Sequence, residues 1–432
     1  MTPRLLAYRS LVKSAKDGSY SNLVLSAVLS KEKDLTSEDK ALFSRLYLGV
    51  VEKKITLDFL LSKLSSIPLN EVSSEALTLL ELGLFQILYM DRIPDHAAVY
   101  ETVEIAKKHC RKASGFINAV LRRGLGEKDT IFHYLDLPGK KGLALQYGYP
   151  KWLVSLWQES YGKEKCEEIL RAQNTPAPMT LRVNTLKTDM ETMKSALEEA
   201  NIPHHRSTLC KNGIVLEKST PIHNIPGYDE GLFFIQDAAA QRAIDRLEIK
   251  EGESVLDLCA APGGKSFAAA MDMKDQGKVL SLELYPQRLS LIKDGAKRLG
   301  IRSLSAEEND STVIRKEWRG AFDKVICDVP CSGFGVIAKK PDIRHKKKEE
   351  KDSLPTLQLA ILKAGAEALR VGGRILYSTC TLNPEENEKV VNAFLKEDPR
   401  FVRIGKEETL FPKGGENDGF YSDLLEKRND EN

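Results

Sequence analysis

The chain has 432 residues, 42% of them hydrophobic, and a formal net charge of +2, which is enough for two or three domains with apolar cores. No apolar run approaches the roughly 18 residues that a membrane span needs, and the N-terminus lacks the pattern of a signal peptide. The seven cysteines form no C-x-x-C pair, so we expect no metal site and no disulfide framework, and the reducing cytoplasm is favoured. With so little net charge, any affinity for nucleic acid has to come from local basic clusters.

Residues 5–123 show the apolar spacing of three and four that is typical of helices, as in Leu77, Leu80 and Leu84. A basic run at the end of one such stretch contains Lys107, Lys108, Arg111 and Lys112. Most runs of this kind are solvated helix ends, and the alternative is a contact with an RNA backbone.

The middle of the chain begins with linker composition at 137–142 and continues into a helical pattern that reaches about Ala172. Short strands are predicted at 180–184, 213–216 and 232–235, with a helix at 189–200 between the first two. This order predicts a small α+β module. Arg182, in the first of these strands, is either structural or an RNA contact.

A strand, a glycine turn and a helix follow one another from Ser254 to Met271. This arrangement lets backbone approach a ligand closely, although the turn alone could be only a tight connection. Glu283 ends a second strand about 20 residues after the glycines, where a carboxylate that grips ribose hydroxyls is expected. Together these features predict a nucleotide-type site. The glycine spacing is not the G-x-G-x-x-G of dinucleotide enzymes.

The strands and helices continue to alternate after this turn, which predicts a mainly parallel sheet with ligands beyond the carboxyl ends of its strands. Four acidic residues lie at or just after predicted strand ends: Asp257, Glu283, Asp310 and Asp328. Taken alone, Asp310 is more typical of a cap.

Two cysteines follow the ends of neighbouring predicted strands, in the segments Asp328–Gly335 and Tyr377–Asn387. A single cysteine is usually a small buried hydrophobic residue. Cys331 and Cys380, both placed beside one ligand crevice, are therefore candidates for chemistry on that ligand.

These motifs resemble those of the RNA cytosine-5 methyltransferase family, in particular its RsmB (Fmu/Sun) branch. The helical region, on residues 92–107 and 116–123, is similar to the NusB-type RNA-binding domain. The resemblance implies a multidomain chain with an all-α NusB-like domain at 1–137 and an accessory α+β RNA-binding module at 143–235. A C-terminal α/β Rossmann-like methyltransferase domain would follow at 236–432.

By this resemblance, the chain methylates carbon 5 of a cytosine in small-subunit (16S) ribosomal RNA, with S-adenosyl-L-methionine as cofactor, as a cytoplasmic monomer without a metal or membrane. A cysteine thiolate that adds to carbon 6 makes carbon 5 nucleophilic enough to accept a methyl group. The resemblance makes Cys380 this nucleophile and Cys331 the helper in proton removal and product release. Asp328 stands where an acid would stabilise the adduct.

The family pattern also implies a set of binding residues. The candidates for the cofactor are Cys259, Ala260, Ala261, Pro262, Gly263, Gly264, Lys265, Glu283, Arg288, Asp310 and Asp328. The candidates for RNA are Lys107, Lys108, Arg111, Lys112, Arg182, Lys339, Lys340 and Arg344.

The sequence departs from the family at two places, since His345 replaces the usual tryptophan and Lys339-Lys340 stands where two arginines are common. Two other classes of function compete with the methyltransferase. A non-catalytic RNA-binding or antitermination factor is disfavoured by the presence of Cys331 and Cys380. A nicotinamide-dependent oxidoreductase needs a different glycine spacing and leaves both cysteines without a role.

Overall fold

The structure, a computed structural model, describes residues 1–17, 21–32, 34–177, 179–218 and 220–429. By packing, the chain divides into two compact units, each treated separately below. Unit 1 comprises Met1–Glu167 together with Lys340–Lys346, and unit 2 comprises Glu168–Lys339 together with Lys347–Asn432. The heptapeptide Lys340–Lys346 therefore packs with unit 1, although the chain on both sides of it belongs to unit 2.

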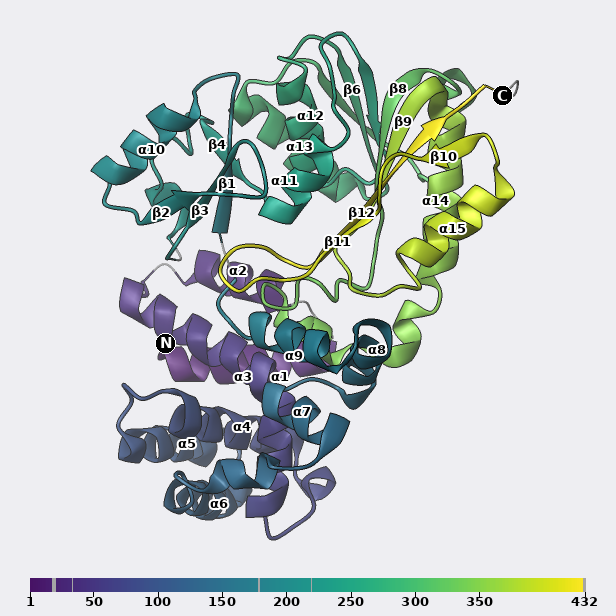
Figure 1. The fold of residues 1–432 in the computed structure, drawn as a ribbon. Coiled ribbons are helices and arrows are strands. Elements are labelled where there is room, and N and C mark those ends of the chain that lie inside the picture. The colour runs from purple at the N-terminus through teal and green to yellow at the C-terminus, as the bar shows by residue number, and fades with distance from the viewer. Residues whose placement is uncertain (18–20, 33, 178, 219, 430–432) are drawn as a thin grey trace. The chain divides into compact units, whose positions relative to one another are not determined.

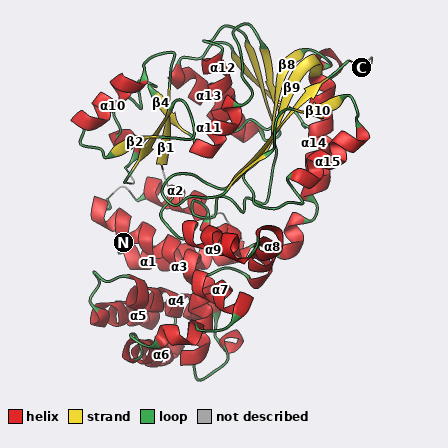
Figure 2. Cartoon of the chain, in the orientation of Figure 1, coloured by secondary structure: helices red, strands yellow, loops and turns green. Residues whose placement is uncertain are grey.

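Unit 1 is helical in its described residues (Figures 1 and 2). Its helices are α1 (Pro3–Asp17), α2 (Ser21–Lys31), α3 (Ser37–Leu64), α4 (Ser74–Tyr89), α5 (Asp95–His109), α6 (Ser114–Gly126), α7 (Gly139–Tyr147) and α8 (Lys151–Tyr161). α7 begins inside the segment that the sequence indicated as a linker. Pro138 precedes this helix, where its missing N–H costs nothing, and Gly142 and Ala144 are buried.

Local signals start the two central helices of unit 1. The side chain of Thr36 accepts from the N–H of Asp39 at the start of α3, and Ser73 does the same for Ala76 at the start of α4. Gly49 lets the two helices approach, because a Cβ there would lie 2.0 Å from the ring of Phe85. The core between the helices is mainly apolar, as their spacing predicted, although Glu81 and Gln86 of α4 are also buried.

The structure contradicts the expected RNA contact at Arg344, which lies in the heptapeptide of unit 1. Its side chain is 1% exposed, donates to the carbonyl oxygens of Glu52 (3.3 Å) and Tyr147 (3.0 Å), and lies 4.2 Å from the ring centre of Tyr149. A guanidinium buried in this way offers no surface to an RNA phosphate. The neighbouring Nε2 of His345 lies 2.8 Å from the carbonyl oxygen of Val51, so this departure from the family pattern is also a packing residue of unit 1.

Unit 2 contains a small antiparallel sheet of order β2-β3-β1-β4 among its described residues. Its strands are β1 (Met179–Val183), β2 (His204–Arg206), β3 (Gly213–Leu216) and β4 (Phe233–Ile235), and helix α10 (Met190–Glu199) packs on them. The helical pattern before this sheet ends with α9 (Lys163–Ala172). The sequence predicted β1, β3, β4 and α10 and missed β2, a three-residue edge strand.

Arg182 shows how the small sheet joins the rest of unit 2. Alternation turns its side chain away from Leu181 and Val183 in the core, and its guanidinium pairs with Asp272 (3.0 Å) and Asp245 (3.4 Å). Because the side chain is 1% exposed, its role is structural, and the expected RNA contact at this residue is corrected as well.

The large sheet of unit 2 has the order β10-β12-β9-β8-β5-β6-β7 in the described residues, with β11 paired to β12. Neighbouring strands from β9 to β7 are parallel, and β12 is antiparallel to β9. The strands are β5 (Ser254–Asp257), β6 (Lys278–Glu283), β7 (Leu304–Glu308), β8 (Phe322–Asp328), β9 (Leu369–Thr379), β10 (Phe401–Arg403), β11 (Glu408–Leu410) and β12 (Phe420–Lys427). The predicted parallel sheet is confirmed.

Helices cover both faces of this sheet (Figure 1). One face carries α11 (Ala238–Asp245), α12 (Gly264–Asp272) and α13 (Pro286–Leu299), and the other carries α14 (Leu354–Ala368) and α15 (Glu388–Glu397). The expected Rossmann-like architecture is thus confirmed. Among the described helices, none combines the length and apolar character required to cross a membrane.

Candidate active site

The glycine turn lies at the carboxyl edge of the parallel sheet, between β5 and α12. The N–H of Ala260 donates to the carbonyl oxygen of Leu282 (2.9 Å), which fastens the turn to the end of β6. Gly263 has a φ of +110°, a conformation that residues with a Cβ rarely adopt, and it leads directly into the N-terminus of α12. Because the first N–H groups of a helix have no acceptor within the helix, this terminus can present them to a ligand.

Glu283 ends β6 beside this turn with a side chain that is 5% exposed. Its Oε1 accepts from the N–H of Tyr285 (3.2 Å) and from Arg288 (3.3 Å), whose other Nη donates to the carbonyl oxygen of Ala261 (2.9 Å). Arg288 therefore joins the carboxylate to the glycine turn. Glu283 and Arg288 therefore both lie beside the glycine turn, where the sequence placed candidate cofactor-binding residues.

Asp257, at the end of β5, is a buried carboxyl with one spare acceptor. Its Oδ2 accepts from the hydroxyl of Ser266 (2.7 Å), whereas its Oδ1 has no hydrogen-bond partner among the described residues. Burial raises the pKa of Asp257 to about 6, against the lowering effect of Ser266 and Lys265. An orphaned buried acceptor at this edge fits a ligand that brings a donor.

Asp328, at the end of β8, is held from two sides. Its Oδ2 accepts from Nζ of Lys265 (2.5 Å), and its Oδ1 accepts from the hydroxyl of Ser378 (2.8 Å). Lys265 is 9% exposed and also lies 5.1 Å from the ring centre of Phe420. The lysine of the glycine turn thus connects the predicted cofactor region to the predicted acid.

The two predicted reactive cysteines lie together. Their Sγ atoms are 3.2 Å apart, at the ends of the parallel neighbours β8 and β9, and both side chains are partly exposed. The hydrogen bond to Cys380, together with burial, raises the pKa of Cys331 well above its usual range. The two thiols therefore share one contact, in which either sulfur can be the donor.

A buried polar network holds the two cysteine loops against each other, and the sequence assigned no role to its members. The hydroxyls of Ser332 and Thr381 lie 2.6 Å apart, and the N–H of Ser332 donates to Glu386 (2.8 Å). Gln358 donates to the same carboxylate (3.0 Å), and Asn387 donates to the carbonyl oxygen of Thr381 (3.0 Å). The available signal was the unusually polar run Asn383–Asn387, which begins three residues after Cys380.

Of the remaining predicted cofactor residues, Pro262 and Gly264 belong to the turn already described. Cys259 and Asp310 have contacts that suit other roles. The pKa of Cys259 is raised well above its usual range by burial first, which suits a packing residue rather than a reactive thiol. Asp310 is exposed and accepts from the N–H and hydroxyl of Thr312 (2.9 and 2.7 Å), the local capping contact that was its alternative.

The predicted RNA contacts differ in exposure. Lys107, Lys108, Arg111, Lys112 and Lys340 are exposed, and of these Lys107 pairs with Glu104 (2.6 Å). Lys339 instead donates to two carboxylates, as described below.

No group of three or more metal-binding side chains is found among the residues that the structure describes.

Three family models match successive parts of the chain. The first 125 residues match the NusB family, residues 149–223 match a ferredoxin-like domain of RsmF/B-like methyltransferases, and residues 244–426 match the 16S rRNA methyltransferase RsmB/F family.

Curated proteins match over nearly the whole length. The chain is 37% identical to the probable ribosomal RNA small subunit methyltransferase B of Bacillus subtilis over 92% of the chain and 89% of that protein. It is 33% identical to the ribosomal RNA small subunit methyltransferase B of Escherichia coli O1:K1, over 98% of both.

Two solved structures share the fold. The crystal structure of the protein PH0851 covers 99% of both chains with a TM-score of 0.80 and 24% identity. A methyltransferase homolog from Pyrococcus horikoshii covers 67% of this chain and 99% of its own, with a TM-score of 0.61 and 27% identity.

Proposed function

We propose, from the premise that this chain belongs to the RsmB/F family of 16S rRNA methyltransferases, that it methylates carbon 5 of a cytosine in small-subunit ribosomal RNA. The observation that carries the proposal is the pair Cys331 and Cys380, with Sγ atoms 3.2 Å apart in the domain that matches the family. A pyrimidine that needs one thiol for attack and a second group for release fits this pair.

S-adenosyl-L-methionine is the cofactor, and when bound it supplies an electrophilic methyl group on a sulfonium. The residues at the carboxyl edge of β5 and β6 fit it: Glu283 suits the ribose hydroxyls, and the free Oδ1 of Asp257 suits a donor such as the amino group. The turn from Cys259 to Lys265 provides backbone close to the ligand, and Arg288 holds Glu283 in place.

Cys380 is the nucleophile in this proposal and attacks carbon 6 of the target cytosine, so that a covalent protein–RNA intermediate forms. Asp328, positioned by Lys265 and Ser378, contacts the polar edge of the ring and stabilises the charge that develops there. Cys331 assists removal of the carbon 5 proton and departure of Cys380, for which its place beside Cys380 is suitable. The target base has to leave any stack to reach both thiols.

RNA contacts are proposed at the exposed basic residues Lys107, Lys108, Arg111 and Lys112 of unit 1 and at Lys340, because exposed cations are available to phosphates. The division of the chain into 1–137, 143–235 and 236–432 is supported by three family matches, one within each segment.

We also propose that the protein works as a monomer in the cytoplasm. Its seven cysteines are free thiols, as a reducing compartment requires.

The proposal is tested by methyl transfer from labelled cofactor to small-subunit ribosomal RNA, followed by bisulfite sequencing of the product. We expect one or few modified cytosines with the wild-type chain and none with Cys380→Ser. If the wild-type chain binds RNA but transfers no methyl group to RNA or to assembling subunits, it is instead a non-catalytic RNA-binding factor.

A further inference from the structure

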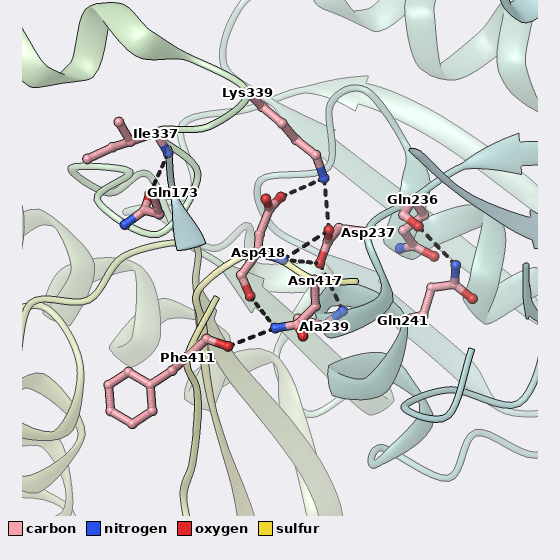
Figure 3. Close-up of polar contacts among 10 residues, drawn as sticks. All are labelled: Gln173, Gln236, Asp237, Ala239, Gln241, Ile337, Lys339, Phe411, Asn417 and Asp418. Atoms are coloured by element: carbon pink, nitrogen blue, oxygen red, sulfur yellow. Dashed lines mark hydrogen bonds and ion pairs between the residues drawn. The ribbon is translucent and has the colours of Figure 1, made fainter. Parts of the chain in front are cut away.

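One cationic side chain near the site is held by two carboxylates. Nζ of Lys339 donates to Oδ2 of Asp237 (2.8 Å) and to Oδ2 of Asp418 (2.7 Å), as Figure 3 shows. Asp237 also accepts from the N–H of Ala239 at the start of α11 and from the N–H of Asp418. The two carboxylate side chains are only 11% and 6% exposed, so the cluster lies mostly away from water.

The three residues come from three separate segments of unit 2. Asp237 precedes α11, Lys339 follows Cys331 by eight residues, and Asp418 precedes β12 by two. The amide of Asn417 donates to the carbonyl oxygens of Phe411 and Asp418, which shapes the last of these segments (Figure 3). The cluster therefore joins the loop of one active-site cysteine to a distant part of the chain.

Short backbone contacts continue from this cluster to the site. The N–H of Gly419 donates to the carbonyl oxygen of Gly335 (2.9 Å), and the N–H of Gly335 donates to the carbonyl oxygen of Cys380 (3.0 Å). A Cβ on Gly335 would lie 2.1 Å from the carbonyl oxygen of Gly419, so the two loops are in direct contact. The next residue, Phe420, presents its ring to Lys265, the partner of Asp328.

We infer that Lys339, Asp237 and Asp418 form a positioning cluster for methyl transfer, which presses the segment before β12 against the Cys331 loop and so sets Cys380 and Lys265 in their working positions. This inference rests on the proposed function. In this inference, Lys339 acts through other residues and contacts neither RNA nor cofactor.

The protonation of Asp418 predicts a pH dependence by which this inference can be tested. Burial, then repulsion by Asp237, raises the pKa of Asp418 to about 7, although Lys339 opposes the shift. Asp237 on the α11 side and Lys339 on the Cys331 loop are the charged groups that influence Asp418 among the described residues. Loss of the Asp418 proton therefore adds a negative charge beside Asp237, and we expect the repulsion to loosen the cluster.

The first test compares Lys339→Met with Lys339→Arg in single-turnover methyl transfer to small-subunit ribosomal RNA. Lys413→Met is the matched control, because Lys413 is exposed and belongs to the segment before β12. We expect Lys339→Met to lower the rate about 100-fold, since small displacements of reacting groups have effects of this size. The affinity for RNA and its salt dependence should stay as in wild type, and Lys339→Arg should recover most of the rate.

A weaker affinity for RNA with a flatter salt dependence and an unchanged rate would overturn the inference and make Lys339 a phosphate contact. A rate equal to wild type in Lys339→Met would overturn it too. If the wild-type chain itself transfers no methyl group, the proposed function fails, and that result is distinct from either of these.

The second test uses Asp418→Asn, which keeps an acceptor for Lys339 and resembles the protonated acid. This variant also tests the inference if Lys339→Met does not fold. The ratio of its rate to the wild-type rate cancels the titration of groups that the two proteins share. We expect this ratio to rise as the pH passes through about 7. A ratio that does not change between pH 6 and pH 8.5 would overturn the inference.

Discussion

Basic side chains have different surroundings in the two units. In unit 1, Lys108, Arg111 and Lys112 are exposed around the end of α5, where water and salt screen them. In unit 2, Lys265 pairs with Asp328, and Lys339 pairs with Asp237 and Asp418. An exposed cation can form a mobile contact with a phosphate, whereas a largely buried ion pair fixes the geometry of the groups around it. In our proposals, the same residue type therefore serves RNA attraction in one unit and positioning in the other.

The largest effect is expected at the cysteine pair of unit 2. Cys380→Ala should lower methyl transfer by more than about 10⁴-fold, because the nucleophile is lost, and should form no covalent species with RNA. Cys331→Ala should still attack carbon 6 but release its product poorly, so a slow band should accumulate on a denaturing gel. Cys110→Ala in unit 1 is the control and should behave as wild type. Accumulation by Cys380→Ala and not by Cys331→Ala would reverse the two roles.

Buried charge should also make unit 2 sensitive to pH. The pKa of Asp257 is raised to about 6 in the folded state, so its contribution to stability is complete below pH 4 and is lost as the pH rises through 6. The wild-type free energy of unfolding should therefore fall relative to that of Asp257→Asn by about 2–3 kcal/mol over this window. Urea denaturation of both proteins at several pH values measures the difference, and parallel curves would contradict it.

A smaller loss is expected where unit 2 binds its cofactor. Glu283→Ala should cost about 1.5–3 kcal/mol of binding free energy, because both ribose hydroxyls lose a charged acceptor. Titration calorimetry with S-adenosyl-L-methionine checks this value. Glu307→Ala, which removes a half-exposed carboxylate from β7, should bind as wild type. Unchanged affinity in a folded Glu283→Ala protein would refute the assignment.

The smallest effect is expected at the exposed lysines of unit 1. Replacing Lys108 and Lys112 together by alanine should weaken binding at all RNA sequences. It should also reduce the slope of log affinity against log salt by about 1.4–1.8, since two phosphate contacts are lost. Lys293 and Lys297, exposed on α13, provide a matched double alanine variant. An unchanged slope in the Lys108/Lys112 variant would mean that these residues do not contact RNA.

Local and nonlocal signals differ in how well they predicted this structure. The strand, turn and helix from Ser254 to Met271 depend on neighbouring residues, and the structure confirms all three. The adjacency of Cys331 and Cys380 also followed from the sequence, because parallel strands end at one edge. Glu386 and Gln358 were missed, since their value lies in a shared buried hydrogen-bond network that no spacing reveals.

The sequence by itself predicted most strands of unit 2, the order of the domains and the two candidate thiols, because apolar periodicity, turn residues and strand-end motifs act over short distances. Only the tertiary structure decided which basic side chains are exposed and which are buried against partners within the protein. Arg182, Lys339 and Arg344 have the composition of RNA contacts, yet each meets its partners across long separations in the chain. Burial and pairing are properties of the packed chain, and so the role of a charged residue follows from its surroundings more than from its type.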